Sequence, residues 1–414
     1  MDTLTHCVAG GLTPLLFKQA PKRTALIWFG IAAGELPDID FFFGNGTPEG
    51  LMLIHRGLTH SLFLQPFLTL ALVVPFFIYV SCRPVPSLSF QSVTQPLGAL
   101  VSKAQGKRAN TQKNGYTAGA RNDKNMANGQ VLSHEYTQTQ GVGMADSGGA
   151  SQAHSLGLMC LIALLAQYVH LFLDSVTLFG TQVLLPWSSA RVALPGMFIV
   201  DFFLLIPIAV LWITALRSTA PRELYWSKKT RFLARLALVW ILVYPLCNLG
   251  VNAVLSTAYA KELHLPREQV SLFTEPFTPF VWKKIVWQGD VCSIETVFPL
   301  GRNKDKGQVD YYPVPETALL DRFAKEIPLF ALYREFAPTL LLVDVVEDGA
   351  NPHLRETVYS FADARYVSSP ESFAQRLRAN STPFAFEVKM SHGRVAAYRY
   401  LDNLEDKNVP WIRL

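Results

Sequence analysis

The sequence predicts a mainly α-helical fold: a polytopic membrane helix bundle of about six apolar segments, followed by a small α+β soluble domain. Half of the 414 residues are hydrophobic and only 17% are charged. An ordinary soluble chain of this length carries more charge. Several apolar runs also approach the length of about 20 residues that an α-helix needs to cross a bilayer core.

The apolar segments follow one another in the first 260 residues, with polar or basic connections between them. We expect them at residues 4–17, 24–36, 62–80, 156–173, 195–216 and 232–258. The first two are short and predict a helical hairpin with a basic turn. The third contains Pro66 and Pro75, which would kink a membrane helix without ending it.

Composition divides the chain into four parts. Residues 1–83 and 154–260 hold three apolar segments each. Residues 84–153 are rich in Gly, Ser, Asn, Gln and Thr, and we expect a disordered loop because they cannot bury enough apolar surface to offset chain entropy. Residues 261–414 should form the small soluble domain. Its expected elements are strands near 281–286, 292–298, 339–346, 357–361, 384–390 and 395–401 and a helix near 317–327.

Basic residues predict the orientation in the membrane. The hairpin turn, the long loop and the connection between the fifth and sixth segments are basic, whereas the opposite connections hold only Arg56 and Arg191. The positive-inside rule then places the basic loops in the cytoplasm and both termini outside, with the C-terminal domain in the periplasm. We assign the net charge of +5 to this orientation and expect no nucleic-acid partner.

Histidines and aspartates stand at four ends of the apolar segments, all on the predicted outer side. The candidate metal ligands are His6, Asp38, Asp40, His55, His60, His170 and Asp174. His170 and Asp174 are four residues apart and share one helix face, so both can reach one ion. Asp38 and Asp40 follow Pro37 and suit carboxylates presented from a loop. His55 and His60 would diverge on a continuous helix, so at least one must come from loop backbone.

Each cluster also has a simpler explanation when taken alone. His170 can hydrogen-bond Asp174 without any ion, and a Pro-Asp-x-Asp turn is more often a capping device. A site is favoured because several such clusters occur together, although the chain has only nine histidines. Ionisable groups at membrane depth are costly and are functional candidates by default.

The residue types indicate an open divalent-metal site. Imidazole and carboxylate ligands suit zinc, with manganese or iron as alternatives, and the absence of cysteine argues against a closed structural zinc site. A metal-activated water could attack an ester or phosphoester. The candidate catalytic residues are Asp40 and Arg56. The planar guanidinium of Arg56 matches a phosphate oxygen, and an ordinary interfacial arginine is the competing interpretation.

These same stretches carry a resemblance to a known family. They are Met1 to His6, Gly34 to Asp40, His55 to Ser61, and His170 to Ser188 with its Pro186-Trp187-Ser188 end. In this order they resemble the YdjM-type family of bacterial inner-membrane proteins, which are described as metal-dependent hydrolases. The resemblance covers roughly the first 260 residues apart from the long loop. It implies that the chain is a multi-pass protein of the bacterial inner membrane.

The ligand order is also similar, more distantly, to part of the pattern of zinc-dependent phospholipase C enzymes. On that comparison His6, one of Asp38 and Asp40, one of His55 and His60, His170 and Asp174 would be ligands. This sequence has no evident match to the later histidines of that pattern.

We therefore expect an integral membrane hydrolase in which a metal-activated water attacks a phosphoester or another ester at the periplasmic membrane face. Membrane lipids are the expected partners and a lipid-linked molecule the expected substrate; the sequence points to no protein partner. The alternative is a non-catalytic membrane scaffold or regulatory protein, whose polar clusters stabilise the helix bundle.

Overall fold

The computed structural model describes residues 2–18, 23–44, 47–82, 147–219, 225–276, 278–299, 308–348, 356–370, 382–406 and 408–414. It forms two compact units: Met1–Val74 with Leu156–Leu414, and Pro75–Ser155. All contacts discussed below lie within the first unit. Most of the loop expected at 84–153 lies outside the described residues, and 147–153 are the first residues of a long helix.

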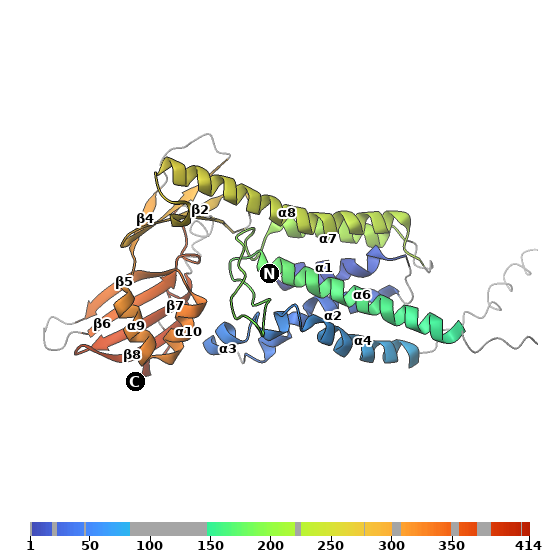
Figure 1. Ribbon diagram of the computed structural model, residues 1–414, viewed down its shortest axis with the longest axis horizontal. Helices are drawn as coiled ribbons and strands as arrows, with labels where there is room; N and C mark the ends of the chain where they lie inside the picture. The colour runs from blue at the N-terminus through green and yellow to red at the C-terminus, as the bar shows by residue number, and fades with distance from the viewer. Residues whose placement is uncertain are drawn as a thin grey trace, which may run out of the picture. The chain divides into compact units, whose positions relative to one another are not determined.

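The N-terminal part is helical (Figure 1). Its α-helices are α1 (Thr3–Leu12), α2 (Arg23–Glu35), α3 (Pro48–Leu53), α4 (Gln65–Cys82), α6 (Ser147–Ser175), α7 (Phe202–Arg217) and α8 (Lys228–Glu262). Short 3-10 helices continue or link them: η1 (Thr13–Leu16), η2 (Leu36–Phe42) and η3 (Leu58–His60). Polar side chains cap several of these helices, as where Asp2 accepts a hydrogen bond from the backbone N–H of Thr5 at the start of α1.

Glycines let α1 and α2 approach closely. A Cβ atom on Gly10 would lie 2.5 Å from the carbonyl oxygen of Gly30, and one on Gly34 would lie 3.0 Å from the Cα of Gly10. Small residues at such a crossing bring helix backbones into contact. The crossing holds the C-terminal end of α2, and with it η2, beside the first turns of α1.

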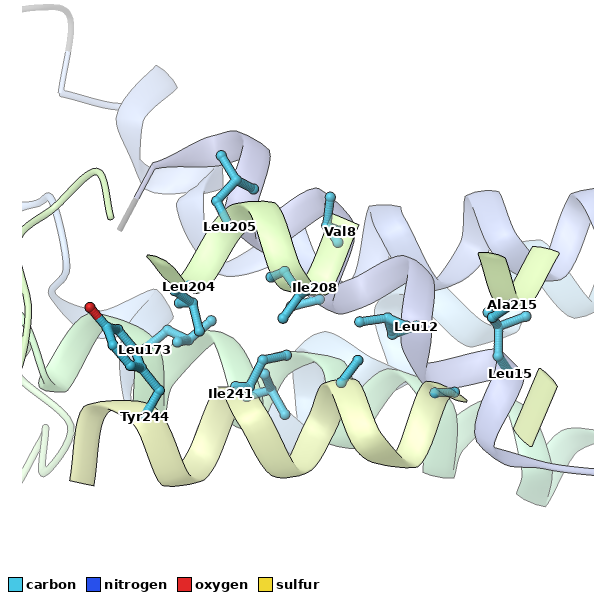
Figure 2. Close-up of a cluster of buried hydrophobic side chains, with 14 of the residues drawn as sticks. Val8, Leu12, Leu15, Leu173, Leu204, Leu205, Ile208, Ala215, Ile241 and Tyr244 are labelled. Atoms are coloured by element: carbon cyan, nitrogen blue, oxygen red, sulfur yellow. The ribbon is translucent and has the colours of Figure 1, made fainter. Parts of the chain in front are cut away.

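Buried apolar side chains join α1, α6, α7 and α8 into one core (Figure 2). Leu12 of α1 and Leu15 of η1 belong to this cluster together with Ile208 of α7, Ile241 of α8 and Leu173 of α6. Close packing of side chains, rather than removal of apolar surface from water, holds helices together inside a membrane. The end of α6 that carries Asp174 is therefore held firmly against the other helices.

The number of membrane spans corrects the expectation of about six. In the described residues two helices are long and apolar enough to cross a membrane, Ser155–Ser175 and Lys228–Glu262. A third span results if Gly50–His60 and Gln65–Tyr79, which meet at a 76° bend, act together. The other expected segments fold into shorter helices: α1 and α2 have 10 and 13 residues, too few for a core about 30 Å thick at 1.5 Å per residue.

The C-terminal part contains two antiparallel sheets, in the region where the sequence predicted strands of an α+β domain. The first has the order β1-β2-β3-β4 and the second β5-β6-β7-β8-β9. The strands of the first sheet are β1 (Val270–Thr274), β2 (Trp282–Gln288), β3 (Val291–Val297) and β4 (Val309–Pro313). Those of the second are β5 (Leu340–Asp348), β6 (Glu356–Asp363), β7 (Pro383–Ser391), β8 (Arg394–Asn403) and β9 (Ile412–Arg413). The last turns of α8 pack on the first sheet, where Ala260 shares a core with Trp282.

Two helices, α9 (Thr317–Glu326) and α10 (Pro328–Phe336), pack on the second sheet. The expected helix at 317–327 is confirmed as α9, whereas α10 was not predicted. The core between these helices and the sheet is aromatic and includes Phe323, Phe330 and Phe361, none of them exposed. Met52 of α3 and Phe179, which follows α6, belong to this same cluster. The sheet part therefore reaches the helical part through a shared apolar contact.

Candidate metal centre

Polar side chains from four parts of the chain meet at one end of the helical part. They are His6 from α1, Asp38 and Asp40 from η2, His55, Arg56 and His60 from the connection between α3 and α4, and His170 and Asp174 from α6. Most are removed from solvent: His60 and Asp174 have no exposed side-chain surface, while the side chain of Asp38 is 22% exposed. The structure thus gathers all of the predicted ligand residues into one region.

Four donor atoms face one another at the spacing of a tetrahedral ligand set. The Nε2 atom of His60 lies 3.1 Å from Nε2 of His170, 3.3 Å from Oδ1 of Asp38 and 3.3 Å from Oδ2 of Asp174. The Nε2 atom of His170 lies 3.5 Å and 3.4 Å from the same two oxygens. A tetrahedral zinc ion with bonds of about 2.0–2.1 Å would separate its ligands by roughly 3.3–3.4 Å. These five distances match such a ligand set, and all four donor atoms lie within 4.8 Å of one another.

The outer hydrogen bonds of the two imidazoles turn their Nε2 lone pairs inward. His170 Nδ1 lies 2.7 Å from the carbonyl oxygen of Gly34, which can only accept, so Nδ1 carries the proton. His60 Nδ1 lies 3.1 Å from Oδ2 of Asp40, which requires a proton on Nδ1 in the same way. Two neutral imidazoles would then present unprotonated nitrogens 3.1 Å apart. A cation between them, or an additional proton, relieves this repulsion.

Asp40 organises the loop around His60. Its Oδ2 accepts hydrogen bonds from the backbone N–H of Arg56 at 3.0 Å and from the hydroxyl of Thr59 at 2.7 Å. Its Oδ1 lies 3.0 Å from Nδ1 of His55. Burial favours the neutral acid, but the hydrogen bonds from His55 and His60 outweigh it and lower the pKa of Asp40 well below its usual value. Asp40 is therefore a carboxylate that orients two histidines.

Asp38 and Asp40 belong with His55 to a second group of donors. One ligand atom from each residue lies within 4.8 Å of the others. Asp38 is a member of both groups, so the two sets adjoin.

His6 and Arg56 contact Oδ1 of Asp174, the carboxylate oxygen that is not among the four donor atoms. His6 Nε2 lies 3.2 Å from Oδ1 of Asp174, and its ring stacks on that of His170 with centroids 3.6 Å apart. One Arg56 nitrogen lies 3.0 Å from the same Oδ1, and another donates to the hydroxyl of Thr177 at 3.0 Å. Arg56 is only 4% exposed, and its guanidinium forms an ion pair with Asp174 in this structure. A contact with a phosphate oxygen stays a prediction.

The connection that carries His55, Arg56 and His60 is held in an unusual backbone conformation. Arg56 has a φ of 56°, in the left-handed region that non-glycine residues rarely adopt. Its carbonyl accepts a hydrogen bond from Gln182 N–H at 3.0 Å, and the Gln65 side chain donates to the carbonyl of Thr59 at 2.8 Å. Such strain persists only where the surroundings fix it, and it is frequent at functional sites.

A cavity of about 610 Å³ opens beside the donors. Asp38, Glu35 and His55 line it together with apolar residues, among them Phe41 and Phe42. A second cavity of about 200 Å³ shares Phe41 and His55 and also touches Asp40. The exposed edge of Asp38 and the ring of His55 are therefore within reach of a molecule in the larger cavity.

Two residues that support the ligands were not predicted from the sequence. The carbonyl of Gly34 orients His170, and Phe179 lies against Arg56 with 4.9 Å from the guanidinium carbon to the ring centre. Both fall within the stretches that carry the family resemblance, which was the available signal. Phe179 follows α6 by four residues, but nothing in its type or spacing distinguishes it from a lipid-facing aromatic residue.

Apolar helices that can span a membrane, together with a buried cluster of histidines and aspartates, define an integral membrane protein with a candidate metal centre. The model of the family described as YdjM inner membrane protein matches residues 1–258, more than half of the 414 residues. The chain therefore belongs to this family and is an inner-membrane protein, which confirms the resemblance. No curated protein and no solved structure matches the chain.

Proposed function

We propose that this protein is a metal-dependent hydrolase that cleaves a phosphoester or another ester of a membrane lipid, at the periplasmic face of the inner membrane. The observation that carries the proposal is the set of four donor atoms from Asp38, His60, His170 and Asp174, spaced 3.1–3.5 Å around both imidazole nitrogens. These residues would hold the ion. A bound divalent cation supplies Lewis acidity and lowers the pKa of a water molecule on it.

The charge of the cluster supports a divalent cation. Asp38, Asp40 and Asp174 bring three negative charges and Arg56 brings one positive charge. With neutral imidazoles, two negative charges remain without compensation in a buried setting, where an uncompensated charge is costly. Zinc suits these nitrogen and oxygen ligands, and manganese and iron are the alternatives.

His55 is the candidate proton acceptor beside the same ion site. His55 lines the larger cavity and Asp40 holds its Nδ1 at 3.0 Å. A carboxylate on Nδ1 keeps the proton there and makes Nε2 the basic atom. In the proposed reaction His55 takes the proton from the attacking water, and Asp40 stabilises the imidazolium that forms. Arg56 balances the charge of Asp174.

The lining of the cavity favours an amphiphilic substrate. Ala32, Leu36, Ile39, Phe41 and Phe42 form most of its wall. Phe41 and Phe42 are 62% and 78% exposed, as expected for side chains at a lipid border. An acyl chain would lie along this wall while its ester reaches Asp38.

Metal analysis and an assay on defined lipids test the function. Purified protein in detergent should hold at least one equivalent of zinc, manganese or iron and should hydrolyse a phospholipid or a phosphodiester. His60→Ala and Asp174→Ala should lose both the metal and the turnover, whereas His264→Ala, at an exposed histidine outside the cluster, should keep both. Wild-type protein without metal and without turnover, whose variants only unfold at lower temperature, would instead indicate a scaffold.

The number of bound ions distinguishes the roles of His55. If His55 is a proton acceptor, His55→Ala retains the metal content of the wild type and loses turnover. If Asp38, Asp40 and His55 hold a second ion, wild-type protein contains two equivalents and His55→Ala contains one. The second result would replace the proton-transfer role given to His55 here.

A further inference from the structure

The side chain of Phe179, which follows α6, lies between the candidate centre and the C-terminal sheet part. The Phe179 ring is 5% exposed and lies between the two parts. On the helical side its centre is 4.9 Å from the guanidinium carbon of Arg56 and 5.6 Å from the ring centre of His55. On the other side it is 5.1 Å from the ring of Phe336 in α10 and 6.1 Å from that of Phe384 in β7.

Two arginines fasten the same junction. Arg365, which follows β6, donates to the carbonyl of Leu178 at 3.1 Å and to that of Phe336 at 2.9 Å. Arg191 donates to the carbonyl of His55 at 3.2 Å, and its guanidinium carbon lies 5.4 Å and 5.6 Å from the rings of Phe179 and Phe336. The carbonyl that precedes Phe179 is thus bonded to the sheet part, and the carbonyl of His55 is bonded to Arg191, whose guanidinium lies against Phe336 of the sheet part.

These contacts add to those that the helical part makes with Arg56. Arg56 sits at a strained φ of 56°, and its Nε is buried without a hydrogen-bond partner among the described residues. The ring of Phe179 covers the flat face of this guanidinium, a contact that strengthens when water is excluded. Without that ring, Arg56 could turn away from the Oδ1 atom of Asp174, which it meets at 3.0 Å.

We propose that the C-terminal sheet part is a brace for the metal centre, and that Phe179 and Arg191 are positioning residues through which it holds Arg56 and His55 in place. The inference rests on the proposed function in that it requires a metal at the four donors. It assigns the sheet part a role in the affinity and geometry of that site. The sheet part is then not a separate module that merely follows the membrane helices.

Binding of Co²⁺ to the full-length protein in detergent tests the brace, because the visible absorption of Co²⁺ depends on its ligand geometry. Phe336→Leu should weaken Co²⁺ binding by about tenfold, at the low end of the effect of residues that support metal ligands, and should alter the absorption spectrum. Phe323→Leu is the matched control. Phe323 is buried in the same aromatic core as Phe336, and its ring contacts are with Phe330, Tyr359 and Phe361 rather than with Phe179.

The conservative series at position 179 gives a second test that does not depend on Phe336. Phe179→Tyr keeps the ring and should keep Co²⁺ affinity, whereas Phe179→Leu should lose it. In an Arg56→Ala background, the effect of Phe336→Leu on Co²⁺ affinity should shrink to the part that Arg191 transmits through His55. The brace is disproved if Phe336→Leu and Phe179→Leu lower the unfolding temperature as Phe323→Leu does, yet bind Co²⁺ with wild-type affinity and spectrum.

These outcomes separate the brace from the enzyme activity. Wild-type protein that binds Co²⁺ but hydrolyses no ester would contradict the proposed function alone, and the variants would still decide the role of the sheet part. Hydrolysis that persists with unchanged Co²⁺ binding in Phe336→Leu and Phe179→Leu would contradict the brace alone.

Discussion

At the scale of single residues, the site depends on groups that never touch the proposed ion. Asp40 is the clearest case, since one carboxylate receives His55, His60, Thr59 and the backbone of Arg56. Such partners fix the ring orientation and raise the basicity of a ligating histidine. The two aspartates of the Pro-Asp-x-Asp turn thus have different roles. Asp38 is one of the four donors, whereas Asp40 orients the histidines.

Asp40→Asn should weaken metal binding without removing a donor from the set of four. The amide has one oxygen where the carboxylate has two, and it carries no charge, so His60 and His55 cannot both keep a strong acceptor. We expect a loss of about 10- to 100-fold in affinity for Zn²⁺ or Co²⁺, measured by competition with a chelator. Asp321→Asn is the control, because Asp321 pairs with Arg334 on the exposed side of α9 and α10. Unchanged affinity in Asp40→Asn would show that the orientation of His60 is fixed by other contacts.

At the scale of elements, the crossing of α1 and α2 sets the position of η2 and of the Gly34 carbonyl. Gly30→Ala would place a Cβ atom 2.5 Å from the carbonyl oxygen of Gly10 and 2.8 Å from the ring of Pro14, so the helices must separate. Overpacking of this kind costs about 1–3 kcal/mol. We therefore expect a lower unfolding temperature and weaker metal binding, because the carbonyl of Gly34 orients the ring of His170.

Gly250→Ala is the control: its Cβ would meet nothing within 4 Å, and alanine is favoured over glycine in a helix interior by about 0.5–1 kcal/mol. Equal unfolding temperatures for the two variants would refute a close crossing.

The elements also show what the sequence could and could not predict. Alternating polarity identified the strands from β2 to β8 except β4, because one face of each is buried.

The predicted number of membrane spans was wrong because an apolar run that is buried inside protein has the same composition as one that faces lipid. Residues 195–201 illustrate this: they form an irregular segment with bends, in which Gly196 N–H donates to the carbonyl of Val176, instead of the start of a membrane helix. The gathering of the His and Asp pairs was predictable from their positions at segment ends. The different roles of Asp38 and Asp40, however, depend on the direction in which each side chain points from η2. A sequence pattern does not contain these directions.

At the scale of the whole molecule, the site constrains the orientation of the chain in the membrane. His60 precedes α4, Asp174 ends α6, and Glu262 ends α8, so the candidate centre and the entry to the sheet part lie at the same end of the apolar helices. The contact of Phe179 with Phe336 requires the sheet part and the centre to share one side of the bilayer. The basic residues around Lys228 lie at the opposite end of α8, and the positive-inside rule favours the cytoplasm for that end. The site and the sheet part should therefore face the periplasm.

Reporter fusions decide this orientation independently of any assay for metal or turnover. Alkaline phosphatase, which is active only after export, should be active when it is fused after Leu414, and a green fluorescent protein fused there should stay dark. A fluorescent protein inserted in the 84–153 loop should be bright, because we expect that loop in the cytoplasm. The reciprocal pattern would place the centre in the cytoplasm and exclude a substrate in the outer leaflet. Activity of the phosphatase at both positions would place the loop and the C-terminus together in the periplasm. The loop would then not share the cytoplasmic side with the basic end of α8. That result would contradict a bundle in which α4 and α6 cross the membrane with the site at one end.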